Sequence, residues 1–338
     1  MVAWIGITVL WIFLYSYLIL ASIDFGAGFF SFIFKIQNKQ VLDRVINRYL
    51  SPAWEGLNIC FVLLFVCVIG LFPQTAYYYG TGLLVPGSIA LILMAVRGSM
   101  YAFYYYTSRD GKVFQIFYGV TGLLIPAVLS SVLTISEGGF ISLEHNKGHL
   151  VIRKLLTSFY SWSVIILAVV SVLYISAMFL TYYANKANDT AASEKMRGLA
   201  LFWSVPTILA CALVFAALQM HNPEHFNQVL NHIWMFELSL VFFLIAVTLV
   251  FQKKFYGLAF FLVLLQFYFA FFGYGLSHLP YLLYPYVDFH VSFSFSVASI
   301  VFIFIAVTVL AILIPFLIIW LRLYILKRNK FSRNNVVK

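Results

Sequence analysis

Charged residues are scarce in this chain. Asp, Glu, Lys and Arg make up 9% of its 338 residues, whereas hydrophobic residues make up 63%. A soluble domain of this length cannot cover its surface with so few charges. The apolar residues fall in continuous runs of about 20 residues or more, which is the length of a helix that spans a bilayer. Because the runs do not alternate with polar residues, they exclude a membrane β-barrel.

Cysteine is also scarce, with Cys60, Cys67 and Cys211 as the only three. The number is odd, no CxxC pair occurs, and all three lie within apolar runs, so disulfides and zinc sites are not indicated. We expect these side chains to pack as small hydrophobic groups. No Gly-rich phosphate loop, Ser-His-Asp set or metal-ligand spacing appears, so we predict no metal held by this chain.

The apolar runs predict an all-α integral membrane protein that forms one polytopic domain over residues 1–338. The first run is too long for a signal-peptide core and has no basic residue before it, so we read it as a retained span. Nine transmembrane helices are predicted, over residues 4–34, 53–73, 79–107, 113–135, 158–184, 199–220, 229–251, 256–278 and 290–326.

The net charge of +10 does not indicate nucleic-acid binding, because the basic residues are dispersed in short loops between spans. Of the 21 Lys and Arg residues, 17 fall in alternate loops or in the tail from Arg322, and three, Lys147, Arg153 and Lys154, fall on the other side. The positive-inside rule therefore places the N-terminus outside and the C-terminus in the cytoplasm. Residues 40–50 are predicted as an amphipathic helix in the inner interface, and residues 136–157 as a polar outer loop that can form a small cap.

Two opposite charges lie deep in apolar runs. Asp24 is 11 residues before Lys35, and Arg97 is 12 residues before Arg109. At the helical rise both lie roughly 16–18 Å above the inner surface. An unpaired charge there costs at least about 3 kcal/mol, so we predict an ion pair. A stripe of small residues around Asp24, with Ala21 and Gly28 on the same face, turns the carboxylate toward protein.

Glu55 lies lower, near the cytoplasmic mouth of the second span, only seven residues after Arg48. Together with Asp24 and Arg97 it would form a series of polar side chains that leads from the cytoplasmic surface into the membrane. Such a series is suited to proton movement. A purely structural role for Glu55 is the alternative. Ser51 can cap the N-terminus of the second span, with Pro52 at the first helical position. Glu55 then lies in the first turn, where the helix dipole stabilises a negative charge.

The remaining ionisable residues give uncertain signals. Glu237 is an acid a few residues into the seventh span from the outer side, and no mechanism is assigned to it. His232 and His278 lie at similar outer levels and are the pair that could hold a haem b, although interfacial histidines are the plainer interpretation. The pairs His145/His149 and His221/His225 are interpreted as solvated loop residues.

Three motifs in the first third of the chain resemble those of subunit II of cytochrome bd-type quinol oxidases. They are Ser-Ile-Asp-Phe-Gly-Ala-Gly at residues 22–28, Pro-Ala-Trp-Glu-Gly-Leu-Asn at residues 52–58, and Arg97-Gly98. Glu55 stands where the family has aspartate, and Leu57 and Cys60 replace its Asn and second Trp. The chain is similar to a divergent branch of the Gram-positive type, for which menaquinol is the expected donor.

The resemblance implies two four-helix bundles plus one peripheral helix, in a heterodimer with subunit I in the bacterial cytoplasmic membrane. It also implies that subunit I carries two haem b groups, one haem d and the quinol site. This chain would then be a non-haem subunit without catalysis of its own, which supports assembly and contributes a cytoplasmic proton path through Glu55. The resemblance leaves open whether a small third subunit exists and whether quinone or lipid binds here.

Two other classes of function stay open. A self-contained transporter would use the Asp24/Arg97 pair as its substrate or proton site, although no inverted repeat is apparent. An electron-transfer protein would bind its own haem through His232 and His278. The absorption spectrum of the purified chain distinguishes the second class from the oxidase subunit.

Overall fold

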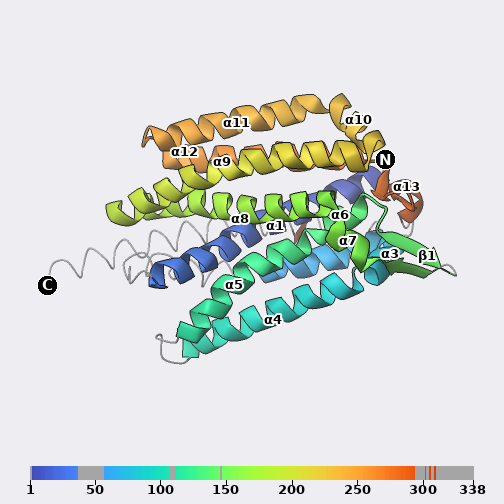
Figure 1. Ribbon diagram of the computed structural model, residues 1–338, viewed down its shortest axis with the longest axis horizontal. Helices are drawn as coiled ribbons and strands as arrows, with labels where there is room; N and C mark the ends of the chain where they lie inside the picture. The colour runs from blue at the N-terminus through green and yellow to red at the C-terminus, as the bar shows by residue number, and fades with distance from the viewer. Residues whose placement is uncertain are drawn as a thin grey trace.

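The computed structural model describes residues 2–36, 57–106, 112–144 and 147–293, with 301, 304–305 and 308–309. Long helices run side by side along the molecule (Figure 1). This agrees with the predicted all-helical membrane class. The long labelled helices are α1 (Val2–Ile36), α4 (Leu84–Tyr106), α5 (Lys112–Leu129), α8 (Phe159–Lys186), α9 (Thr190–His221), α11 (Ile233–Phe251) and α12 (Tyr256–His278).

Within the described residues, six helices are long and apolar enough to cross a membrane, or seven if one bent pair counts as a single span. The bent pair consists of the helix Leu57–Leu71 and α3 (Pro73–Gly82). The chain direction changes by 118° between the two helices. Nearly all of the predicted ninth span, residues 290–326, lies outside the described part. The count of nine, the sidedness and the division into two bundles therefore stay predictions.

The bend corrects the predicted limits of the second and third spans. Pro73 is at the start of α3, where its missing N–H and fixed φ suit the first helical turn but end the preceding helix. Residues 79–82, which we placed in the third span, belong to α3, and α4 begins only at Leu84.

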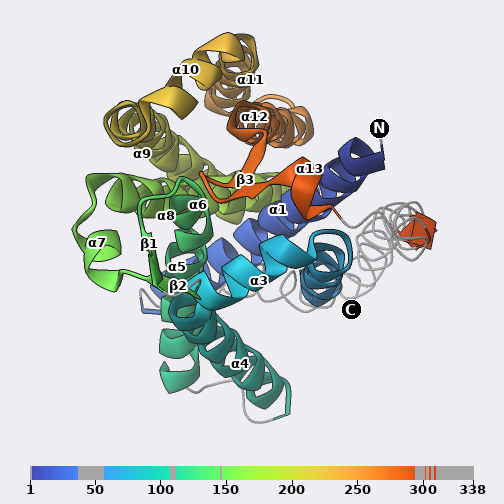
Figure 2. The ribbon, with the colours of Figure 1, turned by 90° about the vertical axis from the view of Figure 1, so that its right-hand side faces the viewer.

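Helix α1 lies at the centre of the end-on view, next to α8, with α11 and α12 on one side and α4 and α5 on the other (Figure 2). The largest core cluster contains side chains from α1, α8, α9, α11 and α12. Small residues at these contacts let the helix backbones approach closely. The fully buried alanines of this cluster are Ala27, Ala177, Ala184, Ala192, Ala200, Ala246 and Ala259.

The short elements gather at the end of the molecule where the N-terminus lies (Figure 1). Much of the predicted outer loop 136–157 is ordered as an antiparallel hairpin followed by the short helix α7 (Ile152–Thr157). The remaining elements of this end are α6 (Ser131–Ser136), β1 (Ile141–Glu144), β2 (Lys147–Leu150), α10 (Pro223–Asn231), β3 (Tyr281–Leu283), β4 (Val287–Asp288) and α13 (Phe289–Ser292).

Candidate functional site

Asp24 of α1 and Arg97 of α4 form the predicted ion pair. Arg97 Nη2 lies 2.9 Å from Asp24 Oδ2, and both side chains are 0% exposed. Arg97 Nε donates to the same oxygen at 3.1 Å, and Nη2 also donates to the Asp24 backbone carbonyl at 2.9 Å. The two residues therefore lie at one depth, as their distances from the ends of their helices predicted.

The other guanidinium nitrogen of Arg97 binds α5. Nη1 donates to the Tyr118 carbonyl at 2.8 Å and to Thr121 Oγ1 at 3.4 Å. A guanidinium has five N–H donors, and these five bonds provide one acceptor for each. The guanidinium carbon also lies 3.8 Å from the centre of the Tyr118 ring, which is cation–π contact. Arg97 thus joins α1, α4 and α5.

Glycine makes room for this pair. A Cβ atom on Gly28 would lie 2.8 Å from Arg97 Nη2 and 2.8 Å from the Tyr118 ring. On α5, a Cβ atom on Gly122 would meet the Phe25 carbonyl oxygen and lie 3.4 Å from Arg97 Nη1. The small-residue stripe predicted on α1 therefore does admit a neighbouring side chain.

Glu55, like the predicted interfacial helix at residues 40–50, lies outside the described residues. The described part of the following helix starts at Leu57, and both Leu57 and Cys60 are buried in a cluster with Tyr17, Ala21 and Phe25 of α1. The two apolar replacements in the family motif are therefore packed against the helix that carries Asp24. Cys67 is also buried, and all three cysteines are free, which agrees with a packing role.

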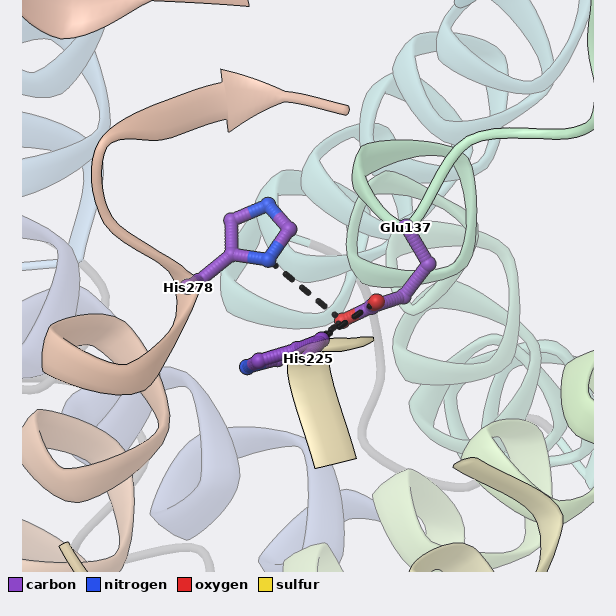
Figure 3. Close-up of side chains that lie close together, drawn as sticks. All are labelled: Glu137, His225 and His278. Carbon is purple, nitrogen blue, oxygen red and sulfur yellow. Dashed lines mark hydrogen bonds and ion pairs between the residues drawn. The ribbon is translucent and has the colours of Figure 1, made fainter. Parts of the chain in front are cut away.

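A second polar cluster, which the sequence analysis missed, lies at the end of the molecule that carries the short elements. Glu137 directly follows α6, His225 is in the first turns of α10, and His278 ends α12 (Figure 3). His225 Nδ1 lies 2.8 Å from Glu137 Oε1 and 3.0 Å from Oε2, and His278 Nδ1 lies 3.6 Å from Oε1. The exposed fractions of the side chains are 0% for Glu137, 4% for His225 and 10% for His278.

Neighbouring donors complete the surroundings of the Glu137 carboxylate. Asn222 Nδ2 donates to Oε2 at 3.2 Å, and the Tyr274 hydroxyl donates to Oε1. Burial raises the pKa of the Glu137 carboxyl, but the hydrogen bond from His225, the charges of both histidines and the bond from Tyr274 together hold that pKa below its ordinary value. The carboxylate is thus stabilised in its ionised form.

The hydrogen bonds of Ser277 orient His225. The Ser277 hydroxyl donates to the Tyr274 carbonyl at 2.8 Å, so its oxygen is free to accept from His225 Nε2, which lies 3.0 Å away. On the other side of the ring, Nδ1 faces the Glu137 carboxylate.

Several predictions for the histidines need correction. His225 is buried rather than solvated, because Asn222 caps α10 and turns its first residues inward. His221 is half-buried between the rings of Phe140 and Tyr160, each with its centre 5.1 Å away. The side chains of His145 and His149 lie outside what the structure describes.

The structure does not bring His232 and His278 together as a haem pair. His278 contacts Glu137 and His225, whereas His232 Nδ1 lies 3.1 Å from the Gln228 carbonyl one turn earlier. Glu237 is in α11 and is exposed on the surface of the chain. One sequence signal for the missed cluster does exist: Glu137 is one of only 11 acids, and it directly follows an apolar span.

Comparisons with known proteins agree with this architecture. The family model for cytochrome bd terminal oxidase subunit II matches residues 2–324. A relative from Bacillus subtilis (strain 168) named "Putative cytochrome bd menaquinol oxidase subunit II" is 29% identical over 291 residues, which cover 84% of each protein. A chain in "The structure of bd oxidase from Geobacillus thermodenitrificans" is 47% identical, with a TM-score of 0.86, over 96% of this chain and 98% of that one. This chain therefore belongs to the cytochrome bd terminal oxidase subunit II family and is a membrane-spanning subunit of a respiratory quinol oxidase.

Proposed function

We propose that this chain is the accessory, non-haem subunit II of a quinol:O2 oxidoreductase in the bacterial cytoplasmic membrane. It pairs with a subunit I that holds two haem b groups, haem d and the quinol site, and it supports assembly of that subunit. Menaquinol is the proposed donor, because the name of the Bacillus relative includes it. The match over residues 2–324 carries this proposal.

The environments of the described histidines support a role without haem. A haem b site with two histidine ligands needs imidazoles that point at one iron from opposite faces of the porphyrin. His225 and His278 instead face one carboxylate, and His221 is stacked between two aromatic rings. Exposed His290 lies against the Phe289 ring, with ring centres 3.8 Å apart.

We further propose that the chain contributes a cytoplasmic proton path, with Glu55 as the entry carboxylate and Asp24 with Arg97 as the next polar station. A guanidinium does not release its proton in a protein, so Arg97 supplies a fixed positive charge. Asp24 Oδ2 already accepts two bonds from Arg97. Oδ1, which lies 3.4 Å from the Tyr118 hydroxyl, is therefore the atom that would accept a proton.

The replacement of Glu55 by Gln tests the path. Glu55→Gln keeps the size and the hydrogen-bonding capacity of the side chain but cannot carry a proton. We expect quinol-dependent O2 consumption to fall several-fold, while the reduced-minus-oxidised haem spectrum of the purified complex stays unchanged. Glu194→Gln is the matched control, because Glu194 is a half-exposed acid that pairs with Arg197 and Lys253. Wild-type turnover in Glu55→Gln would reject the proton path.

The subunit assignment has its own test, which does not depend on Glu55. The tagged chain, purified gently from its host, should bring with it a larger membrane chain and haem b and haem d absorption bands. A colourless chain without a partner would instead favour the transporter. That alternative needs the Asp24/Arg97 pair to face a cavity or pathway, whereas both side chains are 0% exposed and bound to α5.

A further inference from the structure

The cluster of Glu137, His225 and His278 brings together three metal-ligating side chains from distant parts of the chain. One ligand atom from each, a ring nitrogen or a carboxylate oxygen, lies within 4.8 Å of the other two. Figure 3 shows both imidazole rings close to the Glu137 carboxylate, on the same side of it. We propose that Glu137, His225 and His278 form a binding site for a divalent transition-metal ion of the zinc class.

The spacing of the ligand atoms fits tetrahedral zinc. Bonds of about 2.0–2.1 Å from zinc to nitrogen and oxygen place neighbouring ligand atoms about 3.3 Å apart. The observed distances from Glu137 Oε1 are 2.8 Å to His225 Nδ1 and 3.6 Å to His278 Nδ1, on either side of that value. Both distances are thus within about 0.5 Å of the tetrahedral spacing of about 3.3 Å.

The hydrogen bonds around the cluster orient the ligands. His225 Nε2 donates to Ser277 Oγ, which leaves Nδ1 directed at the carboxylate. Asn222 Nδ2 binds Glu137 Oε2, which keeps Oε1 on the side of the histidines. Metal-binding histidines and carboxylates in proteins are commonly held by such outer hydrogen bonds.

A metal ion would take the place of the hydrogen bond between His225 Nδ1 and Glu137 Oε1. On binding, Zn²⁺ accepts the lone pair of His225 Nδ1, and the displaced proton leaves to water. His278 Nδ1 lies 3.6 Å from Oε1, beyond ordinary hydrogen-bond length, and its buried Nε2 has no partner among the described residues. Buried polar atoms in proteins are rarely without a hydrogen-bond partner, and an unpaired one is often explained by an ion or a water molecule at the site.

The ligand set selects the class of ion. Two imidazoles and one carboxylate suit Zn²⁺, whereas Mg²⁺ and Ca²⁺ prefer oxygen ligands alone. Tyr274, whose hydroxyl contacts Glu137, or a water molecule would complete the fourth position. The ion would join the segment after α6 to α10 and α12, so its role would be to hold this end of the molecule together.

Zinc binding is tested on the purified oxidase complex that contains this chain. The complex is treated with EDTA, equilibrated with buffered Zn²⁺, and analysed by mass spectrometry for zinc relative to haem iron. We expect one tightly held zinc ion per complex, at least about tenfold weaker binding in His278→Asn and in Glu137→Gln, and unchanged binding in His290→Asn. His290 is the matched control, because it is an exposed histidine at the same end of the molecule.

The wild-type complex alone can overturn the proposal. A complex that takes up no zinc, or no more than His278→Asn takes up, rejects the site. The zinc-edge X-ray absorption spectrum of the wild type must also show two imidazole nitrogens bound to zinc. A zinc coordination shell without imidazole rejects the site, and this result does not depend on whether the variants assemble. In the same wild-type sample, Zn²⁺ should raise the Tm of the EDTA-treated complex, whereas Mg²⁺ should not.

Discussion

The guanidinium of Arg97 donates from both Nε and Nη2 to a single oxygen of Asp24, at 3.1 and 2.9 Å, in a fully buried site. Burying two charges is costly, and the loss of one partner leaves the other uncompensated. The pair is therefore a structural requirement of the contact between α1, α4 and α5, whether or not it also handles protons.

Arg97→Met should destabilise the complex by about 3–5 kcal/mol, because it leaves the Asp24 carboxylate buried without its partner. The measurement is the thermal stability and the recovery of the purified complex. Asp24→Leu combined with Arg97→Met removes both charges, so the double variant should be more stable than Arg97→Met alone.

Arg197→Met is the control for the loss of an arginine from an ion pair. Arg197 and Glu194 form a pair at 2.6 Å, with side chains that are 16% and 50% exposed. Such a surface pair contributes little to stability because water and salt screen it, so this variant should stay close to wild type. Equal stability losses in Arg97→Met and Arg197→Met would contradict a special role for the buried pair.

A methyl group at position 28 should disturb the same site without changing any charge. In Gly28→Ala, the new Cβ would lie 2.8 Å from Arg97 Nη2, so the guanidinium or the Tyr118 ring must move. Overpacking of this kind costs about 1–3 kcal/mol. The Tm of the complex and its haem content measure the loss.

Gly198→Ala is the matched control, because Gly198 is in helix α9 and no atom lies within 4 Å of a Cβ added there. Alanine favours a helix by up to about 1 kcal/mol over glycine, so this variant should be as stable as wild type or slightly more stable. A Tm for Gly28→Ala equal to that of Gly198→Ala would show that the Arg97 site tolerates the added group.

The Asp24–Arg97 contact was predictable because helical rise is regular. Counting residues from the basic ends of two helices gave two equal depths, and an isolated charge at that depth is too costly to leave unpaired. The second span was predicted to end at residue 73, where the chain bends by 118°. Helix α3 beyond the bend was missed, because its last residues, 79–82, were assigned to the next span. Hydropathy gives the length of an apolar run but not the direction of its axis.

The Glu137 cluster was not predictable in the same way. Glu137 and His225 are 88 residues apart, and no local spacing relates them. His225 was interpreted as a solvated loop residue, and Asn222 and Pro223 just before it were not recognised as the start of a helix. Those two residues instead begin α10, with Asn222 accepting a hydrogen bond from the His225 backbone N–H at 3.2 Å. Only the packing of α10 and α12 against the segment after α6 brings the three ligands together.

The Glu137 carboxylate should make the stability of the complex depend on pH in the acid range. Its pKa is lower in the folded state than in the unfolded chain, so it stabilises the fold above about pH 4.3, its ordinary value, and this stability is lost as the pH falls through the folded-state pKa. Glu137→Gln lacks this titration. In EDTA, its Tm should lie furthest below wild type at neutral pH, and the difference should shrink between about pH 5 and pH 3.

Glu224→Gln separates this effect from the general acid sensitivity of the complex. Glu224 is an exposed acid of α10 that accepts a hydrogen bond from the Tyr284 hydroxyl at 2.7 Å. The variant keeps Glu137, so it should retain the wild-type loss of Tm at low pH. The Tm of Glu137→Gln could instead fall in parallel with that of wild type from pH 7 to pH 3. In that case the pKa of the Glu137 carboxyl does not differ between the folded and unfolded states. The ionised form of Glu137 would then not contribute to the stability of this end of the molecule.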